Sequence, residues 1–286
     1  YIPNAQLVVE GVDNVAQTSM QMNAPTDFLY RIGGGSSYVL DNGNSVIRQI
    51  NTLGNATSIG SPPSVHTTTV FGSAAASRYS AAIAATSDGT KLYALGGNTT
   101  SLFTVALADG ASANLGGSWT GATAIAKIGS TLYIGVNNGT IHTTDLSGAN
   151  DTIVVGTAGA TYPPSDGTPG NPLSAVINPT AFATDGTDLY FLDKANLVRK
   201  LGVAAATVTT IAGTQGSTDI LDGVGGGAHF AGPSGLAFAG GALYTLDGVL
   251  NPNMGLVAPI TVRRIVLSSR DVKTIAGQVS TLGDDD

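Results

Sequence analysis

The stretch Pro179-Thr-Ala-Phe-Ala-Thr-Asp-Gly-Thr-Asp-Leu-Tyr-Phe-Leu192 consists of two short apolar runs joined by an Asp-Gly turn. Such a turn between alternating apolar runs predicts a tight β-hairpin, because the turn needs positive φ angles that glycine adopts without strain. The unit recurs along the chain, and each copy carries a tyrosine in its second strand. These tyrosines are Tyr38, Tyr93, Tyr133, Tyr190 and Tyr244. The chain is therefore built from internal repeats.

Each hairpin is followed by two more strand-like runs. The third runs are Val46–Ile50, Leu102–Val105, Ile141–Thr144, Val198–Leu201 and Val262–Ile265. The fourth runs end in glycine and cover Ala56–Gly60, Thr152–Gly156, Val208–Gly213 and Val272–Gly277, with a weaker Ser112–Gly116 in the second repeat. Four short antiparallel strands per repeat are typical of a β-propeller blade. We therefore expect an all-β fold, a β-propeller with four-stranded blades at approximately 24–60, 78–117, 120–157, 176–213 and 231–277.

The composition excludes several classes of protein. The 286 residues include 39 Gly and no Cys, and only 11% are charged. Without cysteine there is no disulfide framework and no thiolate metal site. A net charge of −7 with few, scattered bases argues against nucleic-acid binding. No apolar run approaches the roughly 18 residues of a membrane helix, so we expect no membrane insertion. Low lysine and Asp-dominated acidity suit a secreted or cell-surface protein of a microbe.

One junction between repeats has a specific motif. The segment Asp222-Gly-Val-Gly-Gly-Gly-Ala-His-Phe-Ala-Gly-Pro-Ser-Gly-Leu-Ala-Phe238 resembles the junction between blades of NHL-repeat β-propellers. Asp41-Asn-Gly-Asn-Ser-Val-Ile-Arg48 and Asp193-Lys-Ala-Asn-Leu-Val-Arg199 resemble that family's hairpin between the second and third strands. The resemblance covers roughly residues 24–60 and 176–286. Between 61 and 175 the second and third repeats lack both the Asp and the Arg.

The resemblance to NHL propellers implies six blades, whereas five can be counted. Leu7-Val-Val-Glu-Gly11 matches a fourth strand, so residues 1–23 are interpreted as the outer strand of a closing blade. Its other strands would lie beyond the C-terminus, which makes residues 1–286 a single propeller domain that belongs to a longer chain. The alternative is a ring that closes on five blades with an extra N-terminal strand.

The predicted first strands of the blades lack catalytic groups. They cover 27–32, 80–86, 122–128, 179–185 and 233–239, and they contain neither His nor Glu. General acid–base catalysis needs groups that titrate near the working pH. The lyase and lactonase relatives among propellers hold Zn²⁺ or Ca²⁺ with His, Glu, Asp and Asn from several blades, and that set cannot be assembled from this sequence. We therefore predict no catalytic residue and no metal ligand set.

Four residues are candidates for ligand binding. Asp41, Asp193 and Asp247 fall at equivalent positions just after the second strands, where they could line one rim and bind cations or sugars. The alternative is that each Asp caps its own turn through backbone N–H groups. His229 occupies the variable position of the junction motif, where a structural hydrogen bond competes with a ligand role. No cofactor is expected, although Asp219, Asp222 and Asp284–Asp286 leave Ca²⁺ open, because Ca²⁺ prefers oxygen ligands.

These features favour an extracellular, non-catalytic propeller that acts as a scaffold or a binding module for proteins or ligands. Loops that depart from the repeat are where partner specificity would reside. They cover 54–77, 156–177 and 247–259, and their expected partners are other proteins or surface glycans. The alternatives are a metal-dependent propeller enzyme of the lyase or lactonase type and a carbohydrate-binding propeller.

Elemental analysis of the purified protein separates the binding module from the metal-dependent enzyme. We expect no stoichiometric Zn²⁺ or Ca²⁺, because no ligand set for either ion can be assembled from the sequence. One tightly held ion per chain would favour the enzyme.

Overall fold

The computed structural model describes residues 84–96, 100–106, 111–161, 163–248 and 261–277 in full. It describes the strands at 25–29, 37–41, 46–50, 56–59, 250–251 and 256–257 by their backbone alone. The chain divides into two compact units, residues 1–125 with 147–149 and residues 126–146 with 150–286. The predictions for residues 1–23 and for Asp284–Asp286 lie outside the described residues.

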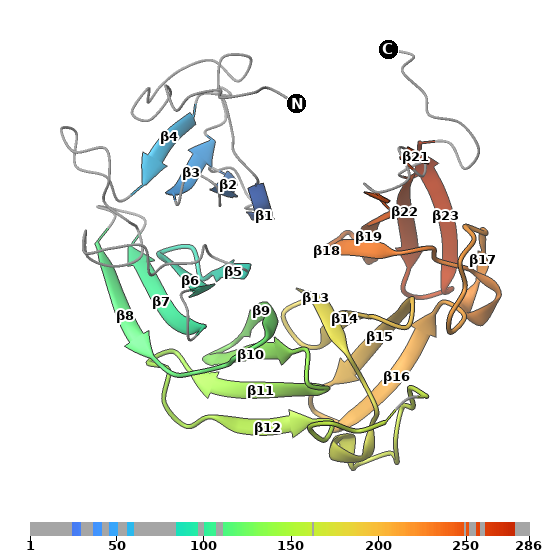
Figure 1. Cartoon of the computed structure of the whole chain (residues 1–286), viewed down its shortest axis with the longest axis horizontal. Coiled ribbons are helices and arrows are strands. Elements are labelled where there is room, and N and C mark those ends of the chain that lie inside the picture. The colour runs from blue at the N-terminus through green and yellow to red at the C-terminus, as the bar shows by residue number, and fades with distance from the viewer. Residues whose placement is uncertain are drawn as a thin grey trace. The chain divides into compact units, whose positions relative to one another are not determined.

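The first unit contains two four-stranded antiparallel sheets, each with its strands in chain order (Figure 1). The first sheet consists of β1 (Pro25–Leu29), β2 (Ser37–Asp41), β3 (Val46–Ile50) and β4 (Ala56–Ile59). The second consists of β5 (Ala84–Ser87), β6 (Lys91–Gly96), β7 (Ser101–Ala106) and β8 (Ser112–Gly116). The weak run at Ser112–Gly116 is thus confirmed as a fourth strand. The division between the units falls within β9 (Ala122–Ile128).

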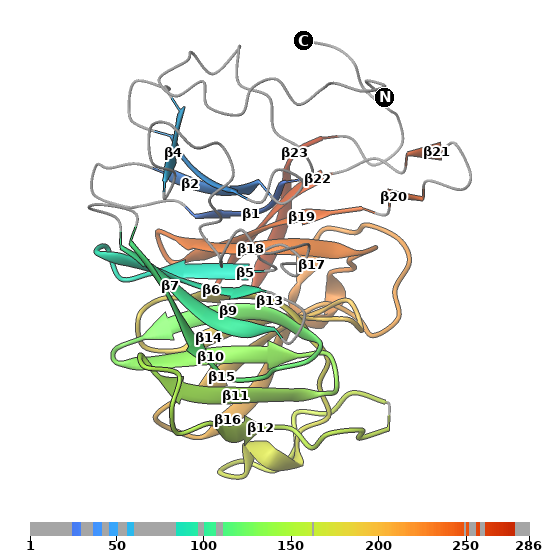
Figure 2. The ribbon, with the colours of Figure 1, turned by 60° about the vertical axis from the view of Figure 1, so that its left-hand side comes forward.

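The strands from β9 onward form three more antiparallel sheets (Figure 2). The third sheet pairs β9 with β10 (Thr131–Val136), β11 (Thr140–Asp145) and β12 (Thr152–Val155). The fourth contains β13 (Pro179–Thr184), β14 (Leu189–Asp193), β15 (Leu197–Gly202) and β16 (Thr207–Ala212). The fifth contains β18 (Pro233–Ala239), β19 (Ala242–Asp247), β22 (Thr261–Val266) and β23 (Asp271–Ala276). A separate small hairpin pairs β20 (Leu250–Asn251) with β21 (Leu256–Val257).

The all-β fold and the four-stranded antiparallel blades are confirmed. The predicted first strands at 122–128 and 233–239 match β9 and β18 residue for residue. Three strands were missed. β17 (Gly223–Val224) lies in the predicted junction loop and adds a fifth strand beside β23, and β20 and β21 lie in the predicted loop 247–259. The number of blades in the complete propeller stays a prediction.

Short 3-10 turns are the helical segments among the described residues. They are η3 (Pro172–Ser174) and η4 (Gly225–Gly227), and both lie in loops that lead into a first strand. In the part of the chain that the structure describes, no helix has the length and apolar character needed to cross a bilayer.

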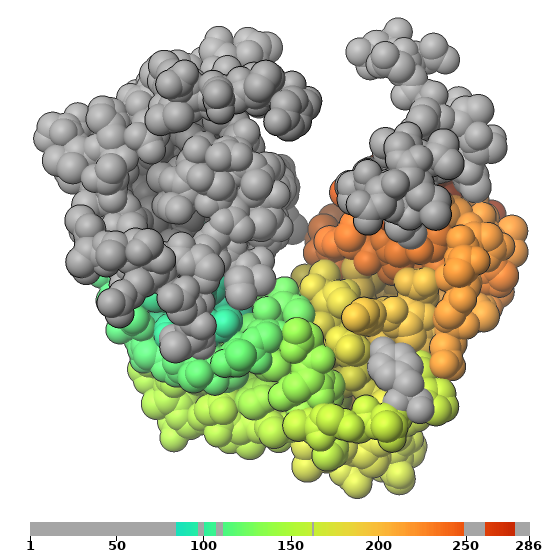
Figure 3. Space-filling model, in the orientation of Figure 1, coloured from blue at the N-terminus to red at the C-terminus, as the bar shows by residue number. Residues whose placement is uncertain are grey.

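The fourth and fifth sheets pack face to face through apolar side chains. Tyr190, Leu192 and Val198 of the fourth sheet pack against Leu243 and Ile265 of the fifth. Figure 3 shows these two sheets, in yellow and orange, in direct contact. Successive side chains of a strand point to opposite faces of its sheet. One face of the fourth sheet therefore packs against the fifth sheet and forms a core with it.

Two of the hairpins contain the same kind of turn, in which an aspartate accepts several hydrogen bonds. In the turn between β5 and β6, Asp88 Oδ1 accepts the backbone N–H groups of Thr90 and Lys91, both at 2.8 Å. Its Oδ2 accepts the hydroxyl of Tyr93 at 3.0 Å. Gly89 has φ +88°, which a side chain would oppose. Asp185, Gly186 and Tyr190 repeat the arrangement between β13 and β14. The aspartates thus connect each turn to its second strand.

Asp88 should make stability depend on pH in the acid range. Burial works against ionisation, but hydrogen bonds from Thr90, Lys91 and Tyr93 outweigh it and lower the pKa of Asp88 to about 2, from an ordinary 3.8. A depressed carboxyl pKa adds stability that is complete above the unfolded-state pKa and is lost as the pH falls through the folded-state pKa. The advantage of the wild type over Asp88→Asn in free energy of unfolding should therefore shrink between about pH 4 and pH 2.

Urea unfolding at several pH values checks this expectation. Tyr93→Phe removes one of the donors to Asp88. This variant should still lose stability as the pH falls from about 4 to 2, but by less than the wild type does. A difference between wild type and Asp88→Asn that is constant from pH 6 to about pH 2 would contradict this role of Asp88.

Candidate functional site

Asp193 and Asp247 end the second strands of the fourth and fifth sheets, opposite the prolines that begin the first strands. Asp193 pairs with Pro179, and Asp247 pairs with Pro233. Both carboxylates are fully buried. Asp41 has the same register opposite Pro25, although its side chain lies outside the described residues. The ligand role predicted for these aspartates stays a prediction, and the structure shows what two of them already bind.

Arg199 joins the carboxylate of Asp193 to the loop that precedes the fourth sheet. Arg199 Nη1 donates to Asp193 Oδ2 at 2.9 Å, and Nη2 donates to Asp166 Oδ1 at 2.7 Å. Asp166 also accepts the backbone N–H and the hydroxyl of Thr210, both at 2.8 Å. We call Asp166, Asp193, Arg199 and Thr210 the Arg199 cluster. It connects the loop before β13 with β14, β15 and β16.

The fifth sheet repeats this cluster. Arg263 Nη1 donates to Asp247 Oδ2 at 2.8 Å, and Nη2 donates to Asp222 Oδ1 at 3.3 Å. Asp222 accepts the backbone N–H and the hydroxyl of Thr274 at 2.8 and 3.0 Å. We call Asp222, Asp247, Arg263 and Thr274 the Arg263 cluster. Two adjacent sheets thus contain the same cluster of two aspartates, one arginine and one threonine.

Backbone carbonyls of the preceding loops complete both clusters. Arg199 also donates to the carbonyls of Val176 and Ser165, and Arg263 donates to those of His229 and Leu221. In each loop the two carbonyls belong to residues that pair with each other as an isolated β-bridge. Each arginine therefore holds its loop at two opposed points, and the planar guanidinium supplies the required fork of donors.

The remaining contacts explain how a charged side chain tolerates full burial. Arg199 and Arg263 are completely buried, and each lies over an aromatic ring, Phe191 at 5.7 Å and Phe230 at 5.1 Å. The Nε atom of each arginine has no hydrogen-bond partner among the described residues. A buried charge is costly unless it is paired, so each arginine depends on its carboxylates.

The aspartates of the clusters respond to burial in different ways. Burial opposes ionisation of Asp166, but the hydrogen bonds from Thr210 and the charge of Arg199 outweigh it and lower the pKa of Asp166. Burial raises the pKa of Asp247, against the N–H groups of Ala231 and Gly232 and the charge of Arg263. Asp247 is therefore the more deeply desolvated of the two carboxylates.

Asp193 caps its own turn, as the alternative predicted, whereas Asp247 caps the loop that enters β18. Asp193 Oδ1 accepts the N–H of Ala195, two residues further on, at 3.0 Å. Asp247 Oδ1 accepts the N–H groups of Ala231 and Gly232, at 2.9 and 3.0 Å, in the loop that enters β18. Both carboxylates thus bind backbone donors in addition to arginine.

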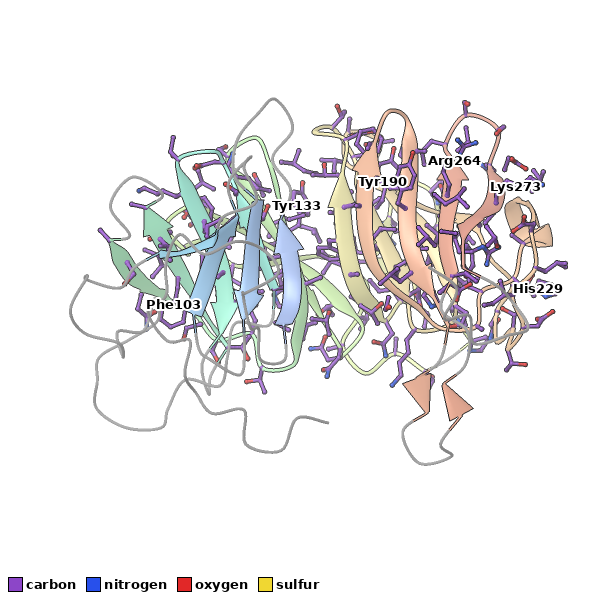
Figure 4. The ribbon with its side chains drawn as sticks, turned by 90° about the horizontal axis from the view of Figure 1, so that it is seen from above. Phe103, Tyr133, Tyr190, His229, Arg264 and Lys273 are labelled. Carbon is purple, nitrogen blue, oxygen red and sulfur yellow. The ribbon has the colours of Figure 1, made fainter. Side chains whose placement is uncertain are left out.

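His229 and the proposed calcium ligands are also placed by the structure. His229 Nδ1 lies 2.8 Å from Asp219 Oδ1, and its carbonyl accepts Arg263. His229 lies in the loop before β18, next to the last sheet (Figure 4). Asp222 belongs to the Arg263 cluster. Among the described residues, no three His, Cys, Asp or Glu side chains gather where they could hold a metal ion.

A second histidine has the hydrogen-bond order of a hydroxyl–histidine–carboxylate triad. His142 Nδ1 lies 3.0 Å from Asp151 Oδ1, and Nε2 lies 3.0 Å from Thr140 Oγ1. The Thr140 hydroxyl is fully buried and donates to Asn138 Oδ1 at 2.6 Å. A nucleophile must reach its substrate, so this array does not have the exposure that nucleophilic catalysis requires. By register His142 stands where Arg199 and Arg263 stand in their sheets.

The arginine clusters were missed by the sequence analysis, which considered the aspartates only as ligand-binding residues or as caps of their own turns. A signal was present. Arg199 alternates in phase with the buried Leu197 and Leu201, whereas Lys200 lies on the other face of the strand and is only partly buried. An arginine in the apolar phase of a strand requires a buried anion. The partners Asp166 and Asp222 could not be read locally, because they lie more than thirty residues away in the loops.

A pocket opens where the fourth and fifth sheets begin. It encloses about 270 Å³ between the start of β13, the turn from β14 to β15, and the start of β18. Thr180 and Gly235 are the residues left out of the ladder by β-bulges in the two first strands. Bulges redirect side chains and are enriched near functional sites. The lining residues are Thr180, Asp193, Lys194, Asn196, Gly232, Pro233, Ser234 and Gly235.

Comparisons with known proteins show the fold. No family model and no curated protein matches the chain. A protein of unknown function from Bacteroides thetaiotaomicron VPI-5482 is similar in structure, with a TM-score of 0.64 at 19% identity over 95% of this chain and 62% of that chain. This chain thus spans about three fifths of that protein.

Two further solved structures are similar. An auxiliary nutrient binding protein from Bacteroides ovatus has a TM-score of 0.58 at 12% identity, over 86% of this chain and 56% of that chain. A calcium-binding protein, regucalcin, from Agrobacterium tumefaciens has a TM-score of 0.53 at 14% identity, over 90% of this chain and 75% of that chain. At these identities the likeness shows the β-propeller fold alone.

A comparison of two adjacent arginines on β22 tests whether the Arg263 cluster stabilises the fold. Arg263 is fully buried, whereas Arg264 is exposed beside Lys273 of β23 (Figure 4). Arg263→Met leaves Asp247 buried without its cation and should lower the free energy of unfolding by about 3–5 kcal/mol. Arg264→Met should change it by less than about 0.5 kcal/mol.

Equilibrium urea unfolding of the two variants gives both values. Arg263→Lys keeps the charge but loses the fork of donors, so it should fall between the wild type and Arg263→Met. Equal losses from Arg263→Met and Arg264→Met would show that the buried ion pairs do not stabilise the fold.

Proposed function

We propose that this chain is an extracellular, non-catalytic binding propeller that presents loops and a pocket on a rigid frame. The observation that supports this function is the anchoring of the loop before β13. Its residues Ser165, Asp166 and Val176 are held by Arg199, whereas the tip around Pro169 and the side chain of Leu173 are exposed. A loop with a fixed base and an exposed tip is suited to binding, because little entropy is lost when a partner docks.

The partners in this proposal are other proteins or surface glycans that contact the loops 54–77, 156–177 and 247–259. Of these loops, 156–177 lies within the described residues apart from Tyr162. Leu173 is 45% exposed in this loop, where it offers apolar area to a partner. The presence of auxiliary nutrient binding proteins among the similar structures supports a secreted or cell-surface location in a microbe.

The repeats are proposed to be of the NHL type. The support is the register shared by the first, fourth and fifth sheets. Arg48 pairs with Val39 two residues before Asp41, as Arg199 pairs with Phe191 two residues before Asp193. The motif that resembles NHL junctions also supplies Asp222, which the Arg263 cluster uses.

We also propose that residues 1–286 form one propeller domain that continues into a sixth blade. The support comes from the outward side of the fifth sheet. Leu192 and Ile211 in the fourth sheet are 0% and 7% exposed, because the fifth sheet covers them. By register, their equivalents in the fifth sheet are Leu246 and Ile275, which are 48% and 50% exposed. Such a face is suited to receive another sheet.

Changes confined to the loop tip test the binding function. Deleting 156–177 would remove Asp166 and Val176 from the Arg199 cluster, so the fold would suffer. Pro169→Ala with Leu173→Ser alters only exposed positions and should leave the melting temperature within a few degrees. Binding of immobilised protein to a glycan array and to secreted proteins should fall at least about tenfold.

Lys273→Gln, on an exposed strand position away from the loop, is the matched control and should bind as the wild type does. The proposed function is contradicted if the wild type retains no ligand, or if the loop-tip variant retains every ligand with unchanged affinity.

A further inference from the structure

The pocket between the fourth and fifth sheets is formed by a recurring backbone feature. The first strands of these two sheets begin with a proline opposite an aspartate, and a bulge lies one or two residues further on. The bulged residues are Thr180 in β13 and Gly235 in β18. Gly235 has φ +63°, and no atom lies within 4 Å of where its Cβ would be. The glycine therefore serves the backbone conformation and leaves the pocket open.

The accessible charge of this pocket is positive. Asp193 lines it, but the carboxylate is fully buried and paired with Arg199. Lys194 is exposed, and no ion pair of its ammonium group occurs among the described residues. A ligand in the pocket therefore meets one free cation in a chain whose net charge is −7. The attraction between Lys194 and a bound anion acts over a few ångströms, whereas salt screens most of the repulsion from the distant acidic residues of the chain.

The remaining lining groups are suited to hydroxyl groups of a ligand. Thr180 and Ser234 are exposed residues with hydroxyl groups, and the Thr180 hydroxyl also donates to the carbonyl of Leu192 at 3.4 Å. Asn196 donates its Nδ2 to the carbonyl of Ser217 at 2.7 Å, which orients Oδ1 as an acceptor. Hydroxyls and amides both donate and accept, so they match a polyol. Among the described residues no aromatic side chain lines the pocket, so a neutral sugar ring would gain no stacking contact from them.

We propose that this pocket binds the carboxylate of a uronic acid residue. Lys194 pairs with the carboxylate, while Thr180, Ser234 and Asn196 bind the ring hydroxyls. The volume of about 270 Å³ is at the small end of ligand pockets and fits one sugar ring. This inference deepens the proposed function and rests on it, since it names the ligand class for one site of the binding propeller.

Titration of the full chain with glucuronate, glucose and inorganic phosphate tests the inference. Isothermal calorimetry or NMR shift changes at Lys194 and Ser234 give the affinities. A single sugar ring should bind with a roughly millimolar Kd. Glucose should bind at least about tenfold more weakly than glucuronate, because it lacks the charged group that pairs with Lys194. Phosphate should also be weaker, since it cannot use the hydroxyl contacts.

Substitutions at Lys194, beside the fourth sheet, and at Ser234, in the first strand of the fifth sheet, supply the controls. Lys194→Gln should weaken glucuronate about tenfold and leave glucose unchanged, and Lys194→Arg should restore most of the loss. Ser234→Ala should weaken glucuronate without changing phosphate. Lys273→Gln, which removes an exposed ammonium outside the pocket, should change none of these affinities.

Four results would overturn the inference. They are equal binding of glucose and glucuronate, equal binding of phosphate and glucuronate, insensitivity to Lys194→Gln, and no glucuronate binding to the wild type. If glucuronate fails but the loop tip of 156–177 still controls ligand capture, the pocket inference fails and the proposed function stands. If both fail, the proposed function fails with it.

Discussion

A buried arginine paired with two aspartates organises the fourth and fifth sheets. Arg199 and Arg263 are each completely buried, and each bridges the end of a second strand to an aspartate in the preceding loop. Removing a guanidinium from water costs several kcal/mol. The contacts of each arginine with its carboxylates and with backbone carbonyls must offset about that amount. The loops before β13 and β18 are therefore held to their sheets. Their bases are part of the core of the sheets, and only their tips are available to a partner.

The same pairing decides what the aspartates can do. Asp193 and Asp247 lie at one rim of their sheets, where a ligand role is easy to imagine from the sequence. Their carboxylates already bind arginine and backbone N–H groups. What remains accessible beside Asp193 is Lys194 with the hydroxyls of Thr180 and Ser234. The charge that a ligand meets is thus opposite in sign to the charge of the whole chain.

Much of the fold follows from local signals, and the site does not. Asp-Gly turns at Gly89 and Gly186, tyrosines in the second strands and alternating apolar runs predict the hairpins and the propeller fold. The phase of Arg199 between Leu197 and Leu201 signals a buried charge. Its partner Asp166 lies 33 residues earlier, and the pocket depends on two bulges in separate sheets. Neither can be derived from spacing, because both result from packing between repeats.

The central claim is that each arginine and its buried aspartate stabilise the fold as a pair. A double-mutant cycle with Arg199→Met and Asp193→Leu measures that coupling in the free energy of unfolding. Arg199→Met leaves Asp193 buried without its cation, and Asp193→Leu leaves Arg199 with Asp166 as its remaining carboxylate, whereas the double change removes both charges of the buried pair. The account predicts that the double variant loses less stability than the sum of the singles, by about 2 kcal/mol. Losses that add to within about 0.5 kcal/mol would contradict it.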